Sequence, residues 1–451
     1  MIKAITNKTL AMKKLHLPLI ALLIAISFGI NAQTWSAVDQ GPDNTVNTLS
    51  VYNSGLYAGG IFDSTAGLNT SKICKWSNDS GWSALGTGVE NTGIWAITGF
   101  NGDLYAAGFF LKAGCVSASN IARWDGMKWQ AAGTGTNRVI YAMAVYNGEL
   151  YVGGGFDSAG GKPVSFIARW NGISWDSLGC GVNYFVQALY VYNGLLYVGG
   201  AFDSAGGKPA NGVAIWNGAA WCTPGTGVNG FVTSFTEYNG NLFAGGDFTM
   251  AGGKPAKNIA QWDGVIWLPA GAGTNNTVTC LEAFNGNLYA GGYFTSAGGV
   301  SANYIAEWNG LFWSALGTGM DSIVSCMSVF NGSLYMGGVF TTAGKQPAMH
   351  IAEWTPLPLA TINTPDNNSS SGPDISVYPN PNYGKFIIQS SDAGRNLSVQ
   401  VYNILGKVVY TGSLNEGATK VDMGIQSEGI YFYKILSGDK PLVSAGRLVI
   451  K

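Results

Sequence analysis

The chain has 451 residues, a formal net charge of −1 and only 11% charged residues, while glycine alone supplies 66 positions. So much glycine with so little charge is typical of many short strands joined by tight turns. Because the chain also lacks clusters of basic residues, its composition argues against nucleic acid as a partner.

The first 32 residues have the pattern of a secretory signal peptide. Lys13 and Lys14 form its positive region, residues 15–30 form an apolar core, and Ala32 precedes the expected cleavage before Gln33. The apolar core is shorter than the roughly 20 residues that a membrane-spanning helix needs. We therefore expect an exported chain that does not span the membrane.

Residues 33–355 contain seven copies of one repeat. With substitutions in single copies, they share a Leu-aromatic-x-Gly-Gly-x-Phe segment, an Ala-Gly-Gly segment, an Ile-Ala-x-Trp segment and, in the first six copies, a second tryptophan. Successive copies are offset by 48 residues once and by 46 residues five times. Such a regular period predicts a repeat architecture. The opening leucines are Leu56, Leu104, Leu150, Leu196, Leu242, Leu288 and Leu334.

Each repeat predicts four antiparallel strands. An Asn-Gly pair, in which both residues take positive φ, joins the first strand to the second. Another Asn-Gly or Asp-Gly turn joins the third strand to the fourth. Four antiparallel strands in every repeat predict one blade of a β-propeller. The asparagines of the first turn are Asn101, Asn147, Asn193, Asn239, Asn285 and Asn331.

The two ends of the repeat array predict closure. An isolated fourth strand, residues 35–38, follows the signal peptide and matches residues 82–85 of the first full repeat. The seventh copy lacks a fourth strand, because Pro356 and Pro358 follow Trp354 closely. We therefore predict an all-β fold, a seven-bladed β-propeller closed by the N-terminal strand, which hides both sheet edges.

Fourteen of the fifteen tryptophans occupy the two repeated tryptophan positions, and Trp95 is the exception. We interpret these fourteen as core residues rather than as ligand platforms, each burying roughly 150–250 Å². Cys280 and Cys326 occupy one small-residue position in neighbouring repeats. We interpret them as buried free thiols, because a disulfide needs Cα atoms within about 7 Å.

The composition changes after the repeats. Residues 356–374 are polar and poor in apolar side chains, which is typical of a linker. Residues 375–451 contain longer strands with alternating apolar side chains. This pattern predicts a small C-terminal β-sandwich.

The tail also carries several short motifs in a fixed order. Their residues include Pro379, Asn380, Pro381, Gly384, Gly406, Lys407, Gly429, Tyr431 and Lys451. In these motifs the tail resembles the type A C-terminal sorting domain of the type IX secretion system of Bacteroidota. The resemblance implies Sec export, passage through the outer-membrane translocon and cleavage of the tail by a sortase. It implies a protein that is released or attached to surface lipopolysaccharide, and the sequence leaves open which.

The repeats are similar to propeller repeats of secreted bacterial proteins and of fungal cortical polarity markers, and their Gly-Gly doublet also resembles kelch repeats. This resemblance covers residues 33–355 and implies no catalytic set. Repeat 2 departs from the pattern, with Ala107 in place of the first glycine of the doublet and Cys115 in place of the last glycine of Ala-Gly-Gly.

The longer connections between strands are expected to share one face of the repeats, which we call the long-loop face. It comprises the Phe-x-x-Ala-Gly-Gly segments and the Gly-Thr-Gly-x-Asn segments, which end in an Asx residue. A ring of such oxygens would suit a cation or sugar hydroxyls, but Asx residues also cap turns through their own backbone. We favour capping, because every repeat carries the residue. The Asx residues are Asp43, Asn91, Asn137, Asn183, Asn229, Asn275 and Asp321.

Residues that break the repeat beside this ring are the candidate binding residues. Exposed aromatic side chains there would suit stacking on sugar rings or docking of a surface protein. Packing inside the propeller channel is the alternative, and the sequence leaves both open. The candidates are Glu90, Trp95, Arg138, Tyr141, Tyr184, Phe185 and Phe231.

The sequence offers little for catalysis. After the signal peptide, His350 is the one remaining histidine, which excludes a multi-histidine metal site. We therefore expect a non-enzymatic protein that binds a glycan or a protein at the cell surface, without cofactor or metal. Two alternatives remain. One is a carbohydrate hydrolase or lyase that uses Asp43, Glu90 or Asp321, and the other is a rigid spacer without a ligand.

Overall fold

The computed structural model describes residues 34–355 and, in the tail, residues 375–379, 382–390, 397–403, 408–415, 417–424, 426, 429–437 and 440–450. The chain divides into two compact units after Leu357. In the described ranges the regular secondary structure is β-strand, mostly in antiparallel sheets, which confirms the all-β prediction. No helix that could cross a membrane occurs in those ranges. The predicted cleavage site, Ala32 and Gln33, lies outside them.

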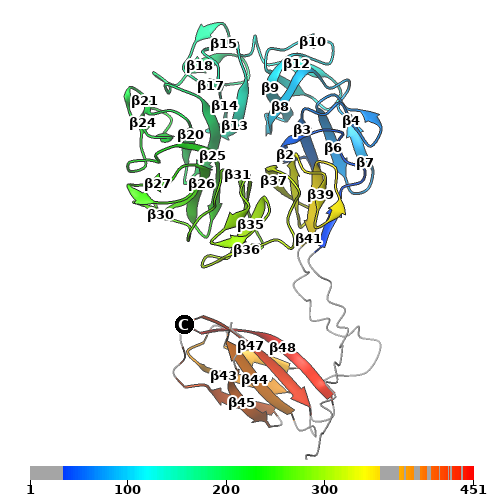
Figure 1. Cartoon of the computed structure of the whole chain (residues 1–451), viewed down its shortest axis with the longest axis vertical. Coiled ribbons are helices and arrows are strands. Elements are labelled where there is room, and N and C mark those ends of the chain that lie inside the picture. Colours follow the sequence, from blue (N-terminus) through cyan, green and yellow to red (C-terminus); the bar gives the residue numbers. More distant parts are fainter. Residues whose placement is uncertain are drawn as a thin grey trace, which may run out of the picture. The chain divides into compact units, whose positions relative to one another are not determined.

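The repeats form seven antiparallel sheets, which we number 1 to 7 along the chain (Figure 1). Sheet 2 has five strands and each of the others has four. The first strands are β2 (Val46–Tyr52), β8 (Val89–Phe100), β13 (Ile140–Tyr146), β19 (Val186–Tyr192), β25 (Phe231–Tyr238), β31 (Val278–Phe284) and β37 (Val324–Phe330). The second strands are β3 (Gly55–Gly60), β9 (Asp103–Ala113), β14 (Glu149–Gly154), β20 (Leu195–Gly200), β26 (Asn241–Asp247), β32 (Asn287–Gly292) and β38 (Ser333–Gly338).

The outer half of each sheet holds the third and fourth strands, which carry the repeated tryptophans. The third strands are β6 (Ile73–Ser77), β11 (Ile121–Trp124), β17 (Ile167–Trp170), β23 (Val213–Trp216), β29 (Ile259–Trp262), β35 (Ile305–Trp308) and β41 (Ile351–Thr355). The fourth strands are β7 (Gly81–Ala84), β12 (Trp129–Ala131), β18 (Trp175–Ser177), β24 (Trp221–Cys222), β30 (Trp267–Pro269), β36 (Trp313–Ala315) and, for sheet 7, β1 (Thr34–Ala37).

Glycine and asparagine set the geometry of the first hairpin in each sheet. Asn147 and Gly148 have φ values of 48° and 74°, as the Asn-Gly pattern predicts. The Gly-Gly doublet of the second strand permits close packing of the next sheet. A Cβ atom on Gly153 would lie 2.2 Å from Cγ1 of Val186 in sheet 4. Glycine at this position therefore lets adjacent sheets approach each other.

Every first strand also contains a β-bulge near its start, where the register shifts by one residue. A bulge takes one side chain out of the regular alternation of the strand. In sheets 2 and 3 the bulged residues are Trp95 and Tyr141. The bulge therefore determines the direction in which the side chains of Trp95 and Tyr141 leave their strands.

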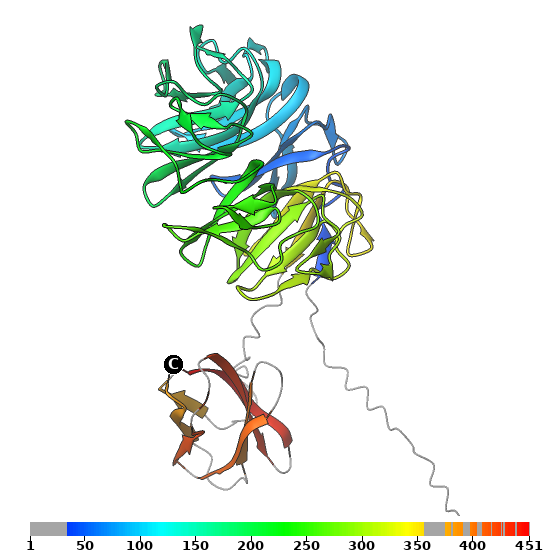
Figure 2. The ribbon, with the colours of Figure 1, turned by 60° about the vertical axis from the view of Figure 1, so that its left-hand side comes forward.

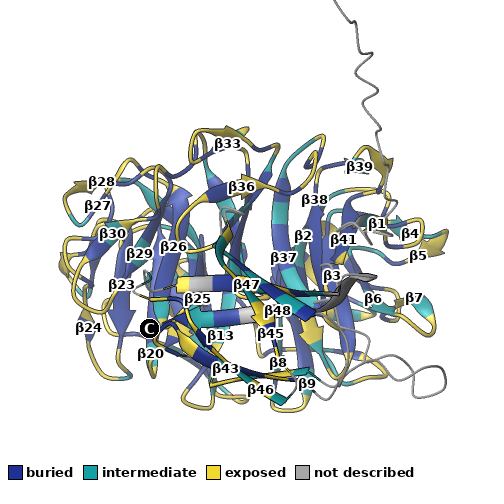
Figure 3. Ribbon diagram, turned by 90° about the horizontal axis from the view of Figure 1, so that it is seen from below, coloured by how far each residue is buried: buried dark blue, intermediate teal, exposed yellow. Residues whose placement is uncertain are grey.

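The long loops pack on one another and form the long-loop face. Thr136 forms an isolated bridge with Ala159, and the Asn137 amide donates a hydrogen bond to the Ser158 carbonyl at 3.1 Å. In Figure 3 these loops are largely exposed, whereas the strands between the two rims are buried. The loops contain small hairpins: β4 (Ser64–Thr65) with β5 (Leu68–Asn69), β15 (Ser158–Ala159) with β16 (Lys162–Pro163), β21 (Ser204–Ala205) with β22 (Lys208–Pro209), β27 (Met250–Ala251) with β28 (Lys254–Pro255), β33 (Ser296–Ala297) with β34 (Val300–Ser301), and β39 (Thr342–Ala343) with β40 (Gln346–Pro347).

Sheet 2 differs from the other sheets. Its first two strands are longer, and a short strand, β10 (Val116–Ser117), pairs with the end of β9. Ala107 lies within β9, and Cys115 lies in the turn between β9 and β10.

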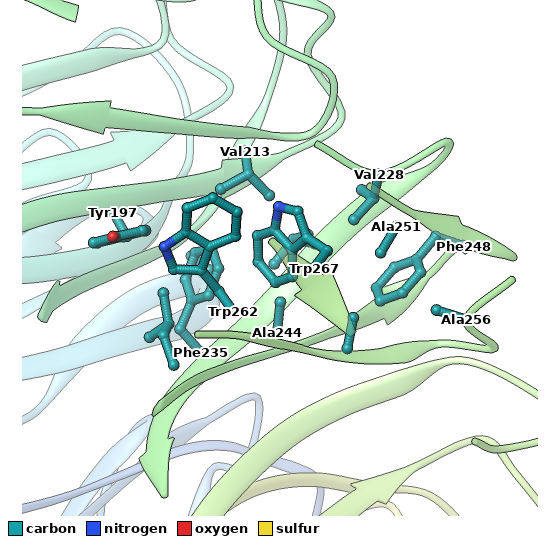
Figure 4. Close-up of a cluster of buried hydrophobic side chains, with 14 of the residues drawn as sticks. Tyr197, Val213, Val228, Phe235, Ala244, Phe248, Ala251, Ala256, Trp262 and Trp267 are labelled. Carbon is teal, nitrogen blue, oxygen red and sulfur yellow. The ribbon is translucent and has the colours of Figure 1, made fainter. Parts of the chain in front are cut away.

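The tryptophans pack between sheets as predicted. Eleven of the fourteen repeated tryptophans are buried, and Trp35, Trp76 and Trp124 are half-buried. In every sheet the third-strand and fourth-strand rings are 4.6–5.4 Å apart between centroids. The indole N–H of Trp267 donates to the Pro224 carbonyl of sheet 4 at 2.8 Å. Figure 4 shows Trp262 and Trp267 packed with residues of both sheets.

The N-terminal strand completes the last sheet. β1 pairs with β41 in antiparallel register, with Trp35 opposite Trp354, as predicted. In Figure 1 the dark blue N-terminal strand lies beside the yellow β41. The Trp82 indole of sheet 1 donates to the carbonyl of Val38, the residue after β1, at 3.2 Å. One hydrophobic cluster contains residues of both sheet 7 and sheet 1, including Cys326 and Val46. The last and first sheets are therefore joined by the same contacts as the other neighbours.

The six cysteines are free thiols. Cys280 and Cys326 are buried, which confirms their interpretation as buried thiols, and Cys74 is buried as well. Burial raises the pKa of Cys74 and of Cys280 to about 12. These thiols are therefore packing residues, because a neutral buried thiol is a poor nucleophile.

In its described residues the tail unit contains two antiparallel sheets, of three and four strands, and Figure 2 shows these strands. One hydrophobic cluster, which includes Phe386, Val399 and Tyr431, holds the two sheets together. Of the predicted motif residues, Asn380, Pro381, Gly406, Lys407 and Lys451 lie outside the described residues. The strands are β42 (Ile375–Tyr378), β43 (Lys385–Ser390), β44 (Leu397–Asn403), β45 (Val408–Leu414), β46 (Gly417–Asp422), β47 (Gly429–Ser437) and β48 (Lys440–Ile450).

Candidate functional site

The Asx residues of the long-loop face hold neighbouring loops together. Oδ1 of Asn183 accepts hydrogen bonds from the backbone N–H groups of Asp203 and Ser204, both at 3.1 Å. The prediction that such residues cap their own backbone is therefore wrong in detail, because the partner is the loop of the small hairpin about 20 residues later. The same bonds are made by Asp43, Asn137, Asn229, Asn275 and Asp321.

Asn91 is the exception in this set. It lies within β8, with a φ of 83° and register shifts on both sides. In the repeat alignment, Asn91 stands at the position of the loop residues of the other sheets, but in the structure it lies in a strand. The extension of β8 and β9 accounts for this difference.

The two acids of the Asx set have pKa values below their ordinary values. Burial raises the pKa of Asp43, but hydrogen bonds from Ser64 and from the Asp63 N–H outweigh it. For Asp321, burial is likewise outweighed by the hydrogen bonds from Thr341 and Thr342. Both carboxylates are therefore ionised and already engaged with loop N–H and hydroxyl groups.

Four predicted aromatic residues form a continuous row on the long-loop side of sheets 2, 3 and 4. The ring of Trp95 meets the ring of Tyr141 edge-on at 6.4 Å, and Tyr141 meets Phe185 edge-on at 6.4 Å. Phe185 then stacks on Tyr184, with centroids 4.3 Å apart and planes 18° apart. We call Trp95, Tyr141, Phe185 and Tyr184 the aromatic row.

The aromatic row is neither fully buried nor fully exposed. Tyr184 is 49% exposed, and the other three side chains are half-buried. Burial raises the pKa of Tyr141, so its phenol stays neutral at physiological pH. The rings of the row therefore pack against one another, and the ring of Tyr184 is exposed enough to contact a ligand.

Phe166 packs against two rings of the aromatic row, and it was not among the residues predicted from the sequence. Its ring lies 6.1 Å from Tyr184 and 5.9 Å from Phe185. Phe166 has a φ of 63°, which is unusual for a bulky residue. The aligned repeats carry unlike residues at this position, so the pattern gave no signal for an aromatic contact.

The other three candidates lie outside the row. Glu90 forms an ion pair with Lys112 at 3.2 Å across the β8–β9 extension. Arg138 is exposed, with its guanidinium 3.9 Å from the Asp157 carboxylate. Phe231 is half-buried at the start of β25, one sheet beyond Phe185. The seven candidates are therefore not one cluster.

Glu282 is a further unusual residue that the sequence analysis did not identify. It lies on β31, and burial raises its pKa from 4.5 to about 7. At this position the other first strands carry Ser50, Thr98, Ala144, Tyr190, Thr236 and Ser328. An aligned comparison of the seven first strands would have singled out the one acid.

Substitution of Glu282 by Gln is expected to stabilise the protein above neutral pH. Below about pH 4.5 the carboxyl is protonated in both states. Between pH 4.5 and 7 the unfolded chain ionises first, so the native protein loses stability as pH rises. Because the side chain keeps some contact with water, we expect the Glu282→Gln variant to be more stable by about 1–3 kcal/mol at pH 8.

The measurement is urea unfolding of both proteins from pH 4 to pH 8. The stability difference should disappear towards pH 4. Glu237→Gln, on the exposed side of neighbouring strand β25, is the matched control for the removal of one carboxylate. A flat difference between the wild type and Glu282→Gln would contradict the raised pKa.

The described residues contain no group of three His, Cys, Asp or Glu side chains placed to hold a metal ion. His350 is 8% exposed, and burial lowers its pKa. Its Nδ1 atom lies 3.3 Å from the Gly338 carbonyl, so the ring is packed in sheet 7. The chemistry available on the long-loop face is therefore stacking on aromatic rings and hydrogen bonding to side-chain and backbone oxygens.

Residues 376–451 match the secretion system C-terminal sorting domain family. The protein is therefore directed by the type IX secretion system to the cell surface or the medium, which confirms the predicted localisation. No curated protein matches the chain in sequence.

The similar solved structures include PorZ, a surface component of the type IX secretion system of Porphyromonas gingivalis. It is 15% identical with a TM-score of 0.48, and the match covers 92% of this chain and 60% of that chain. The extracellular domain of BT4673 from B. thetaiotaomicron is 13% identical with a TM-score of 0.46, and the match covers 93% of this chain and 59% of that chain. This chain thus spans about 60% of the length of those chains. At these values the similarities carry no argument about function.

Proposed function

We propose that the protein is a non-enzymatic, secreted or surface-displayed binding protein that recognises a glycan through the aromatic row. The observation that carries this proposal is the stacked pair of Tyr184 and Phe185, half open to solvent on a face rich in amide and hydroxyl groups. Sugar rings present apolar C–H faces and many hydroxyls. An aromatic platform beside polar loops suits both features.

We further propose that the seven sheets are the blades of a closed β-propeller. Support comes from the pairing of β1 with β41 and from the Trp82 bond to Val38. Contacts also join the first strands in sequence from β2 through β37 and back to β2. This architecture would present the long loops of all seven sheets on one rigid face.

The hydrolase alternative that uses Asp43, Glu90 or Asp321 has less support. A glycosidase needs a carboxylic acid with a raised pKa to protonate the leaving group. Asp43 and Asp321 have lowered pKa values, and Glu90 is paired with Lys112. We therefore propose binding without hydrolysis by these residues.

The test is binding of the purified protein to a glycan array. We expect the double variant Tyr184→Ala/Phe185→Ala to bind its glycans at least tenfold more weakly, because the stacking surface is removed. A tenfold loss corresponds to about 1.4 kcal/mol. Melting curves of both proteins will show that the loss is not caused by unfolding.

Tyr293→Ala is the matched control, because Tyr293 is 48% exposed just after β32 in sheet 6, away from the row. It should bind like the wild type. Unchanged binding by the double variant would contradict the role of the row. Release of sugars from a polysaccharide panel by the wild type would contradict the non-enzymatic assignment.

A further inference from the structure

One residue position is variable between the repeats and faces the junction between sheets. It immediately precedes the third strand, and its residue has positive φ in all seven sheets, from 60° to 75°. In sheet 4 this position is occupied by Gly212, whereas in each of the other sheets it is occupied by a residue with a side chain. Those residues are Lys72, Asn120, Phe166, Asn258, Tyr304 and His350.

A pocket of about 460 Å³ lies where Gly212 leaves this space open, between sheets 4 and 5. The neighbouring position Gly230 also lacks a side chain, whereas the equivalent residues in sheets 3, 4 and 6 are Arg138, Tyr184 and Asn276. The volume is within the range of about 300–1,000 Å³ that small-molecule sites occupy. The lining includes Asp203, Asn211, Gly212, Asn229, Gly230 and Met250.

A second pocket, of about 390 Å³, lies at the equivalent place between sheets 6 and 7, where Tyr304 occupies the position of Gly212. It is lined by Asn303 and Thr318, which correspond to Asn211 and Thr226 of the first pocket. There, however, Tyr304 packs against the core of sheets 6 and 7. The second pocket does not include Thr295, the counterpart of Asp203. The pocket between sheets 4 and 5, where position 212 has no side chain, includes Asp203 in its lining.

The first pocket offers hydrogen-bond acceptors. Oδ1 of Asp203 accepts a hydrogen bond from Asn183 at 2.6 Å, and Nδ2 of Asn211 donates to the Thr226 carbonyl at 3.0 Å. Within residues 34–355 no hydrogen bond engages Asp203 Oδ2 or Asn211 Oδ1. Both oxygens are therefore free to accept hydrogen bonds from a ligand.

The charge and polarity of the other lining residues indicate which class of ligand fits the pocket. It contains no lysine or arginine, so an anionic group would face the Asp203 carboxylate without a balancing charge. Met250 is 37% exposed and adds an apolar wall. Acceptor oxygens beside an apolar wall suit a ligand with several hydroxyl groups and an apolar face.

We propose that this pocket binds one uncharged sugar unit of the recognised glycan. Two hydroxyls of the sugar donate to Asp203 Oδ2 and Asn211 Oδ1, and its C–H face packs on Met250. This inference rests on the proposed glycan recognition by the long-loop face, and it adds the class of sugar and the place where that unit sits.

The test variant is Gly212→Asn, which copies the residue found in sheets 2 and 5. Asn120 and Asn258 have φ values of 66° and 64°, so asparagine is accommodated in this conformation. The Asn120 side chain bridges the Phe110 N–H and the Thr136 carbonyl, which fills the space. At Gly212 a Cβ atom would lie 2.7 Å from a Val228 methyl group and 2.9 Å from the Gly230 carbonyl oxygen, so both groups must shift slightly. Val182, the counterpart of Val228 in the preceding repeat, is found beside Phe166, and we therefore expect Gly212→Asn to fold.

The probes are a glycan array with neutral, acidic and amino-sugar termini, followed by titration calorimetry with the best-bound oligosaccharide. We expect binding to neutral glycans and at least a tenfold loss of affinity in Gly212→Asn and in Asn211→Ala. Asn303→Ala, in the second pocket, is the matched control and should bind like the wild type. Melting temperatures close to that of the wild type will confirm that the variants are folded.

The outcomes separate this inference from the proposed function. Wild-type affinity in Gly212→Asn, together with a loss in Tyr184→Ala/Phe185→Ala, overturns the pocket and leaves glycan recognition by the aromatic row intact. Binding restricted to acidic or amino-sugar termini overturns the neutral-sugar assignment. Absence of glycan binding by the wild type overturns both proposals.

Discussion

Removal of residues 34–38 is expected to lower the free energy of unfolding by more than about 4 kcal/mol, a large part of the roughly 5–15 kcal/mol typical of a folded domain. The deletion removes the half-buried Trp35, its ring contact with Trp354 and the carbonyl that accepts the Trp82 indole bond. It also exposes the edge of β41, and exposed edges promote association between chains.

Calorimetry and size-exclusion chromatography will measure this effect. We expect a lower and broader melting transition together with dimers or larger assemblies. Ser36→Ala is the matched control, because Ser36 is exposed on the same strand and should leave both properties unchanged. A monomeric deletion variant with the wild-type melting temperature would show that β1 does not close the array.

Substitution of Trp267 by Ala is expected to destabilise the protein by about 3–5 kcal/mol. Trp267 is 1% exposed between sheets 4 and 5, and its replacement leaves a cavity in the cluster shown in Figure 4. The Pro224 carbonyl also loses its donor. Trp216, 7% exposed in the adjacent cluster, should respond in the same range when replaced by Ala.

Chemical unfolding with urea will measure the loss. Trp124→Ala is the comparison, because this indole in sheet 2 is only half-buried and should lose less. Trp267→Phe should fall between the wild type and Trp267→Ala, since it keeps an aromatic ring but removes the indole donor. Equal stability of Trp267→Ala and the wild type would contradict the packing role.

The strands and turns of the repeats could be predicted from the sequence because their causes are local. Two consecutive residues with positive φ favour Asn-Gly, and Asn147 with Gly148 adopts this turn. The pairing of Trp35 with Trp354 is a long-range contact, yet the repeat made it predictable, because the missing strand at one end matched the extra strand at the other.

The candidate site was predictable only in part. Trp95 and Tyr141 drew attention because they interrupt the repeat, and the structure brings them together with Phe185. Phe166 was missed because its contacts come from a different repeat. The capping role of the Asx residues was assigned to the wrong partner, since the bonded loop lies about 20 residues away.

By itself, the sequence determined the β-strands, the tight turns, the buried tryptophans and the route of export. These follow from side-chain alternation, from the backbone preferences of glycine and asparagine, and from motifs read along the chain. The tertiary structure decided which side chains of different repeats meet. The bulge at Trp95, the open space at Gly212 and the desolvation of Glu282 each depend on how adjacent sheets pack, and this packing is a property of pairs of repeats rather than of any one segment.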